Sequence, residues 1–134
     1  VGSYSIGKHN GGFMPKHHSY VTYSKKEKEI VKSGIAAIRE VLMGENADKK
    51  ESLLLALEWF MDPYYGQSIY IVDIWDDLCE LLQTVIITPN DEAVAEDAWY
   101  LLEAYTWPPF EILENNMDKV PEQLRPYVLG GLGT

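Results

Sequence analysis

Four carboxylates in residues 73–80 are the strongest candidates for chemistry in this sequence. They are Asp73, Asp76, Asp77 and Glu80. Spacings of three, four and seven residues place side chains on one face of an α-helix. Such a face can dock the lysines or arginines of a partner, bind a divalent cation through its oxygen atoms, or remain solvated without a role. The docking patch is the hypothesis that we carry forward, with the solvated face as the open alternative and no metal expected.

Two further groups are candidates for contact with the same partner. Glu92 and Glu96 belong to a second acidic cluster, which stacked helical hairpins could align with the first, although Glu92 also suits the N-terminal dipole of a helix. Tyr64 and Tyr65 follow a proline in a polar loop, and tyrosine is enriched in protein interfaces. The tyrosines could instead close one end of a helical core. We expect all four residues to be partner-binding.

The sequence carries no signature of catalysis or of a bound cofactor. It lacks a phosphate-binding loop, a dinucleotide-binding glycine pattern, a nucleophile elbow and a paired-histidine zinc motif. His9, His17 and His18 have no carboxylate near them, because residues 1–26 contain none. Cys79 falls on the apolar side of its helix, as a small buried hydrophobe does. We therefore predict that the protein is not an enzyme and has no catalytic residue, metal or cofactor.

Charge is segregated along the chain. The net charge is -10, yet residues 51–118 hold fifteen acidic side chains and no lysine or arginine, whereas residues 1–50 hold nine basic and five acidic ones. Solubility alone explains a negative balance but not the absence of lysine. An acidic surface attracts basic partners and repels phosphate backbones, so we expect a basic protein partner and no direct nucleic acid. Without a long apolar run or a visible secretion signal, we expect no membrane association and a cytoplasmic location.

Helical periodicity follows residue 23. Apolar residues at helical spacing, two capping boxes (Ser24 with Glu27, Asp48 with Glu51) and proline breaks predict six helices. Their expected ranges are 24–43, 48–62, 69–84, 88–107, about 109–117 and 121–129. The sequence thus predicts an all-α fold of five to six antiparallel helices, arranged as HEAT-like helical hairpins or as an irregular helical bundle. We expect an irregular N-terminal segment over residues 1–23 and a single helical domain over residues 24–134.

A shift of the sequence by 45 residues produces a weak self-match. It aligns Leu57-Glu58 with Leu102-Glu103, Phe60 with Tyr105, and Pro63 with Pro108. A period of about 40–47 residues is typical of HEAT-like arrays of helical hairpins. The offset therefore also supports a helical-repeat adaptor that binds a protein or peptide partner in a groove.

The chain resembles the helical immunity proteins that bacteria pair with polymorphic or contact-dependent growth-inhibition toxins. The resemblance lies in the chain size, the basic-free stretch 51–118, the acidic residues 73–80 and the pair Tyr64-Tyr65. It implies binding to a toxin domain, often a basic nuclease, and occupation of the positive cleft that holds the phosphates of its substrate. Lysines near the N-terminus, such as Lys8 and Lys16, depart from a uniformly acidic inhibitor and leave open which face docks.

Overall fold

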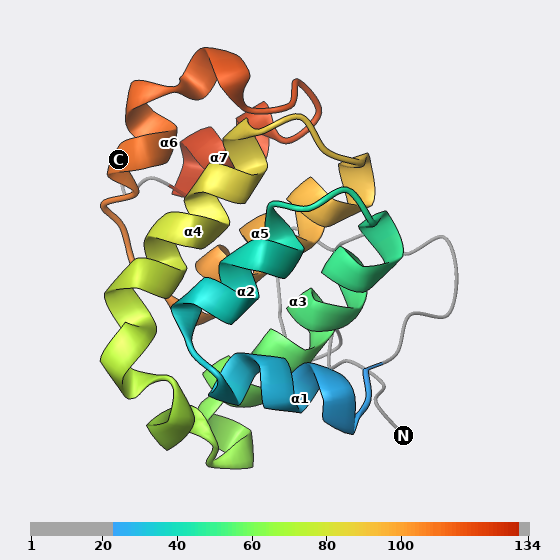
Figure 1. Cartoon of the computed structure of the whole chain (residues 1–134). Coiled ribbons are helices and arrows are strands. Elements are labelled where there is room, and N and C mark those ends of the chain that lie inside the picture. Colours follow the sequence, from blue (N-terminus) through green and yellow to red (C-terminus); the bar gives the residue numbers. More distant parts are fainter. Residues whose placement is uncertain (1–22, 132–134) are drawn as a thin grey trace.

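The computed structural model describes residues 23–131, and every regular element in this range is helical (Figure 1). The α-helices are α1 (Lys25–Lys32), α2 (Ile35–Leu42), α3 (Ala47–Met61), α4 (Trp75–Ile87), α5 (Glu92–Tyr105), α6 (Glu111–Asn115) and α7 (Arg125–Gly131). Short 3-10 turns separate some of them: η2 (Pro63–Tyr65), η3 (Ser68–Tyr70), η4 (Val72–Ile74) and η5 (Met117–Lys119). The predicted all-α fold is confirmed. Of the expected irregular segment, residues 1–22 lie outside the described range.

Two helices replace the single helix that the sequence predicts for residues 24–43. The predicted capping box is present: the Ser24 hydroxyl accepts from the Lys26 amide, and the Ser24 amide donates to Glu27 Oε1 at 2.8 Å. The break falls at Gly34, whose φ of 109° lies in a region that favours glycine. Apolar residues continue at helical spacing on both sides of Gly34, so periodicity alone hides the break.

The other predicted helix boundaries also shift. Asn46, not Asp48, caps α3 by accepting from the Lys49 amide at 3.1 Å, so the second predicted capping box is wrong. The predicted N-cap Thr88 instead ends α4, because its hydroxyl donates to the Thr84 carbonyl at 2.7 Å. The first residues of the predicted 69–84 helix form 3-10 turns, and the last two predicted helices are shorter than expected.

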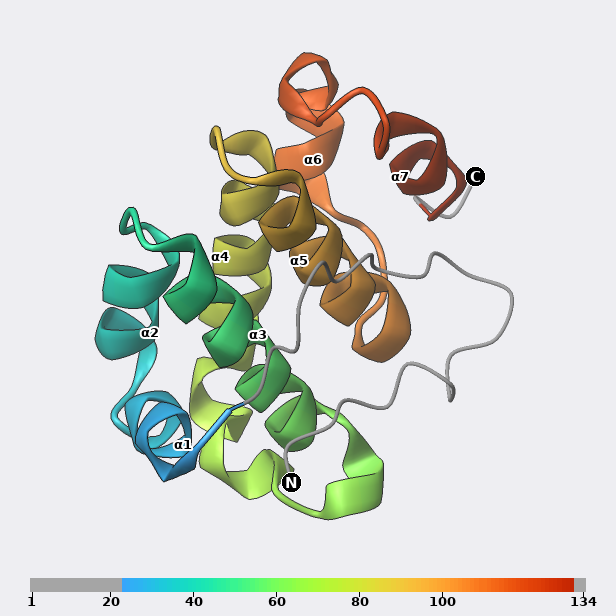
Figure 2. The same ribbon diagram turned by 90° about the vertical axis from the view of Figure 1, so that its right-hand side faces the viewer.

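The helices pack in layers around a continuous apolar core (Figure 2). On one side α1 and α2 contact α3, and α2 also reaches α4; on the other side α5 contacts both α3 and α4. Phe60, Leu82 and Trp99 are fully buried between these layers. Burying a side chain of this size stabilises the fold by about 1.5–3 kcal/mol. The layered core holds the outer face of α4 in a fixed position.

The direction of α5 relative to its neighbours follows from specific hydrogen bonds. Lys50, near the start of α3, donates to Asn90, just before α5, and Tyr105 at the end of α5 donates to Glu58 near the end of α3. Helices α3 and α5 therefore run parallel. Only residues 88–91 join α4 to α5, so these two helices form an antiparallel hairpin.

Candidate protein-docking site

The acidic residues of α4 and of the turn before it form the exposed part of the candidate site. Asp73 lies in η4, and Asp76, Asp77 and Glu80 lie on the solvent side of α4. Leu78 and Leu82, on the opposite side of the helix, are fully buried in the core. We call these four carboxylates the acidic face. In the part of the chain that the structure describes, none of them makes an ion pair or a side-chain hydrogen bond.

Two lysines of α1 lie on aromatic rings. The Lys28 ammonium is 3.9 Å from the centre of the Trp59 ring, and the Lys32 ammonium is 4.5 Å from the centre of the Tyr70 ring. Both distances fall within the range of cation–π attraction. These two cations therefore have partners other than the carboxylates of α4.

The two predicted tyrosines differ in availability. Tyr64 is 79% exposed, whereas Tyr65 is half-buried, with its ring centre 6.2 Å from that of Trp59 and 5.1 Å from that of Tyr64. The Tyr65 ring thus contacts those of both Trp59 and Tyr64, and the Tyr64 ring is largely exposed to solvent. Next to them, Ile69 and Val72 are also largely exposed. Helical spacing over the predicted helix 69–84 would place Val72 on the apolar side of that helix. Val72 instead lies in the 3-10 turn η4, where its side chain is exposed.

The second acidic cluster does not extend the acidic face. Glu96 is only 2% exposed, so its predicted role in partner binding is corrected: α5 is buried between its neighbours along most of its length. Glu92 is exposed, but it lies at the start of α5, beside the end of α4. At 1.5 Å per residue, α4 separates Glu92 from Asp76 by roughly 20 Å.

Buried acidic residues instead join α5 to α3. Glu58 Oε2 accepts the hydroxyls of Tyr100 at 2.8 Å and Tyr105 at 2.6 Å. Burial, followed by the hydrogen bond to Glu58, raises the pKa of both tyrosines. Burial also raises the pKa of Asp97 to about 9, with further contributions from Glu51, Glu96 and Glu58. Glu58 thus joins α5 to α3, and none of these buried carboxylates is accessible to a partner.

A cavity of about 430 Å³ opens between α4 and the connection from α5 to α6, which passes beside α4 (Figure 1). It is lined by Trp75, Asp76, Cys79, Glu80, Gln83, Thr106, Trp107, Pro109, Glu111 and Ile112. None of these described lining residues is basic. Burial, reinforced by Asp76 and Glu80, raises the pKa of Cys79 to about 11, so its thiol stays protonated at neutral pH. Asp76 and Glu80 belong to both the acidic face and the cavity lining, so the two features adjoin.

Only part of this cavity could be predicted from the sequence. Trp107, an aromatic residue at a bend of the chain and thus a candidate interface anchor, is 81% exposed. Glu111 in α6 and Gln83 in α4 were not singled out. The signal that was available is the unusual position of a tryptophan next to two prolines, Pro108 and Pro109, in a stretch without basic residues.

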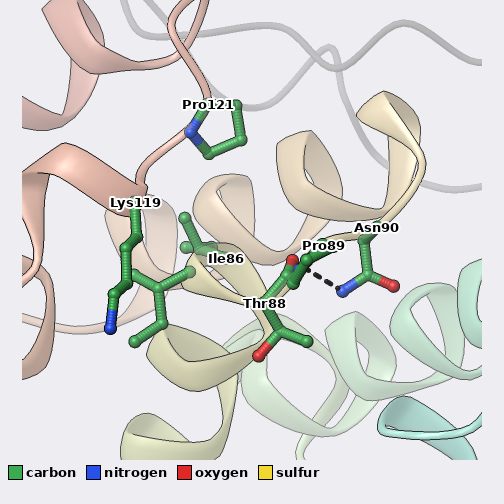
Figure 3. A pocket seen from close by; sticks show the side chains of 7 residues that line it. Ile86, Thr88, Pro89, Asn90, Lys119 and Pro121 are labelled. Atoms are coloured by element: carbon green, nitrogen blue, oxygen red, sulfur yellow. Dashed lines mark hydrogen bonds between the residues drawn. The ribbon is translucent and has the colours of Figure 1, made fainter.

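A second cavity, of about 620 Å³, lies at the other end of the α4–α5 hairpin (Figure 3). Lys119 and Pro121 face the turn that contains Thr88 and Asn90, and the Asn90 amide donates to the Thr88 carbonyl at 3.2 Å. The charged residue among its described lining is Lys119. This cavity therefore does not suit a basic partner, and it does not belong to the docking site.

Within residues 23–131, no three His, Cys, Asp or Glu side chains are arranged to hold a metal ion. His9, His17 and His18 lie outside the described residues. None of the helices in the described range combines the length and the apolarity that a membrane crossing requires. Comparison of the chain with protein-family models, with curated proteins and with solved structures gives no match. The acidic face is therefore the basis of the function proposed below.

Proposed function

We propose that this chain is an acidic protein-binding module that neutralises a basic toxin, most naturally a nuclease, by occupying its active-site cleft. The observation that carries the proposal is the acidic face: Asp73, Asp76, Asp77 and Glu80 are exposed and make no ion pair within the described range, while Lys28 and Lys32 lie on aromatic rings. Four adjacent like charges repel one another, and a cationic partner removes that repulsion.

The proposed mode of action is competition with a nucleic acid. A nuclease cleft is positive because it holds phosphates, so a negative protein surface fits it and excludes the substrate. Tyr64 is 79% exposed and offers an aromatic side chain of the kind that dominates binding energy at interfaces. In this role the chain catalyses nothing and acts in the cytoplasm, where the nucleic acids are.

We expect a neighbouring reading frame to encode a basic toxin domain, and the direct test uses that domain. We expect the purified chain to inhibit the nuclease activity of that domain and to bind it in isothermal titration. The double substitution Asp76→Lys with Asp77→Lys should weaken binding by about 100-fold or more. Glu40→Lys with Glu45→Lys makes the same charge change at exposed positions outside the acidic face and is the matched control. Equal affinity of the two variants would refute the proposal.

One observation favours the alternative, a helical-repeat adaptor that binds a protein or peptide. Helices α3 and α5 run parallel and side by side, and the 45-residue shift aligns them, as equivalent helices of neighbouring hairpins would be. Capture of partners from an extract of the source cells distinguishes the two functions. One stoichiometric basic partner supports the inhibitor, whereas several unrelated partners support the adaptor.

A further inference from the structure

Three carboxylates from two helices surround the cavity between α4 and the α5–α6 connection. Asp76 and Glu80 come from α4, and Glu111 comes from the first turn of α6. All three are exposed, and none makes an ion pair or a side-chain hydrogen bond with a residue of the described range. The cavity therefore presents acceptors from more than one direction, which suits a cation with several donors better than a flat acidic surface does.

Two indole rings border the same cavity. Trp75 is half-buried, and Trp107 is 81% exposed, so most of this large apolar side chain meets solvent. A planar guanidinium stacks on an indole face more readily than an ammonium does and still donates in its own plane. The chain already places a cation on an indole elsewhere, with Lys28 on Trp59. An occupant that stacks on Trp107 would cover its exposed surface.

Gln83 provides an independent indication of what the cavity accepts. Its side chain is only 5% exposed and lines the cavity. Gln83 Oε1 accepts from the amides of Ile112 and Leu113 at 3.0 and 3.3 Å. Within the described range no group accepts from its amide nitrogen, and this nitrogen is not among the fully buried atoms that lack a partner, so it is open toward the cavity. A metal ion offers no acceptor for this nitrogen, whereas a peptide offers the carbonyl of its backbone.

We infer that this cavity receives an arginine side chain of a basic protein, with the guanidinium between Glu80, Asp76 and Glu111 and against Trp107, and with a backbone carbonyl of the same segment accepting from Gln83. The inference rests on the proposed function and states which residue type of the partner the cavity recognises. Ile112 and Pro109 supply apolar wall for the methylene stem of the arginine.

The test uses a free probe and the full chain, without any toxin. N-acetyl-arginine amide is titrated into ¹⁵N-labelled protein, with the citrulline analogue as the uncharged isostere and the lysine analogue as the point charge. We expect saturable shifts of the Trp75 and Trp107 indole signals and of the Gln83 side-chain amide. The fully buried Trp99 indole should not move. The lysine probe should bind more weakly and the citrulline probe weaker still.

Matched variants locate the site. Glu80→Gln should weaken binding of the arginine probe by about fivefold to tenfold, because it removes one charge-assisted acceptor. Trp107→Ala, at an exposed position, should weaken it by a similar factor. Glu40→Gln removes the same charge at an exposed position outside both the acidic face and the lining of the cavity, and it should change binding by less than about twofold. Equal shifts with citrulline, or unmoved Trp107 and Gln83 signals, would overturn the inference.

The outcomes separate this inference from the proposed function. If the arginine probe binds as described but the basic domain beside the gene is not inhibited, the cavity assignment stands and the proposed function fails. If that domain is bound and the binding is lost in the Asp76→Lys, Asp77→Lys variant but is unchanged in Glu80→Gln and Trp107→Ala, the acidic face docks the partner and the cavity assignment fails.

Discussion

The hydroxyl of Tyr105 donates to Glu58 Oε2 at 2.6 Å and so joins the last residue of α5 to α3. Tyr100, one turn earlier, donates to the same oxygen at 2.8 Å. A buried carboxylate with two hydroxyl donors costs far less than one without them. This pair of bonds holds α5 against α3, and α5 in turn supports α4 and its acidic face.

Removing the Tyr105 hydroxyl should destabilise the fold. We expect Tyr105→Phe to lower the free energy of unfolding by about 1–3 kcal/mol, because a buried carboxyl acceptor loses one donor. Urea unfolding followed by circular dichroism measures the change. Tyr64→Phe removes a hydroxyl from an exposed ring and should change stability by less than about 0.5 kcal/mol. Equal effects of the two substitutions would show that the Tyr105 bond does not support the fold.

Asp97 predicts a pH-dependent stability. Its folded pKa of about 9 lies above the ordinary value, so the folded state holds the proton in a pH range where the unfolded state has lost it. The stability that the protonated Asp97 side chain contributes is fully present below about pH 4 and is lost as the pH rises toward 9. Asp97→Asn cannot lose a proton, so the stability of the variant relative to the original chain should increase by about 4 kcal/mol between pH 5 and pH 8.

Urea unfolding of both proteins at several pH values tests the Asp97 prediction. The difference between the two proteins cancels the titrating groups that do not interact with Asp97. Glu45→Gln, at an exposed position, is the control and should give a difference that does not change with pH. A pH-independent difference for Asp97→Asn would contradict the raised pKa.

Gly34 should be sensitive to substitution by alanine. An added Cβ would meet no atom within 4 Å, so the whole cost comes from the backbone, whose φ of 109° is unfavourable for a side chain. We expect Gly34→Ala to destabilise the fold by about 1–2 kcal/mol in thermal or urea unfolding. Gly130→Ala has equal space, lies inside α7 without a positive φ, and should be neutral or stabilising. If Gly34→Ala were also neutral, α1 and α2 would not need this break.

Features set by neighbouring residues could be predicted from the sequence. The Ser24–Glu27 capping box is local, and its geometry is as expected. The four carboxylates of the acidic face share the solvent side of α4 because helical spacing alone determines which residues share a face.

Features set by tertiary contacts could not be predicted in this way. Glu96 has the composition of a surface residue, yet α5 is covered by neighbours that no local pattern reveals. Gln83, Trp107 and Glu111 meet around one cavity only because α6 folds back onto α4. Thr88 was predicted to start α5, but its back-bond to Thr84 makes it the end of α4.

We propose above that the acidic face, which makes no ion pair within residues 23–131, meets a cationic protein. The most direct test of this proposal is the association rate with the basic domain encoded beside the gene, measured by stopped-flow fluorescence at increasing salt. We predict fast association that slows by about tenfold or more from low to physiological salt, slow association for Asp76→Lys with Asp77→Lys, and unchanged behaviour for Glu40→Lys with Glu45→Lys. Identical rates for all three proteins, or no association, would contradict the account.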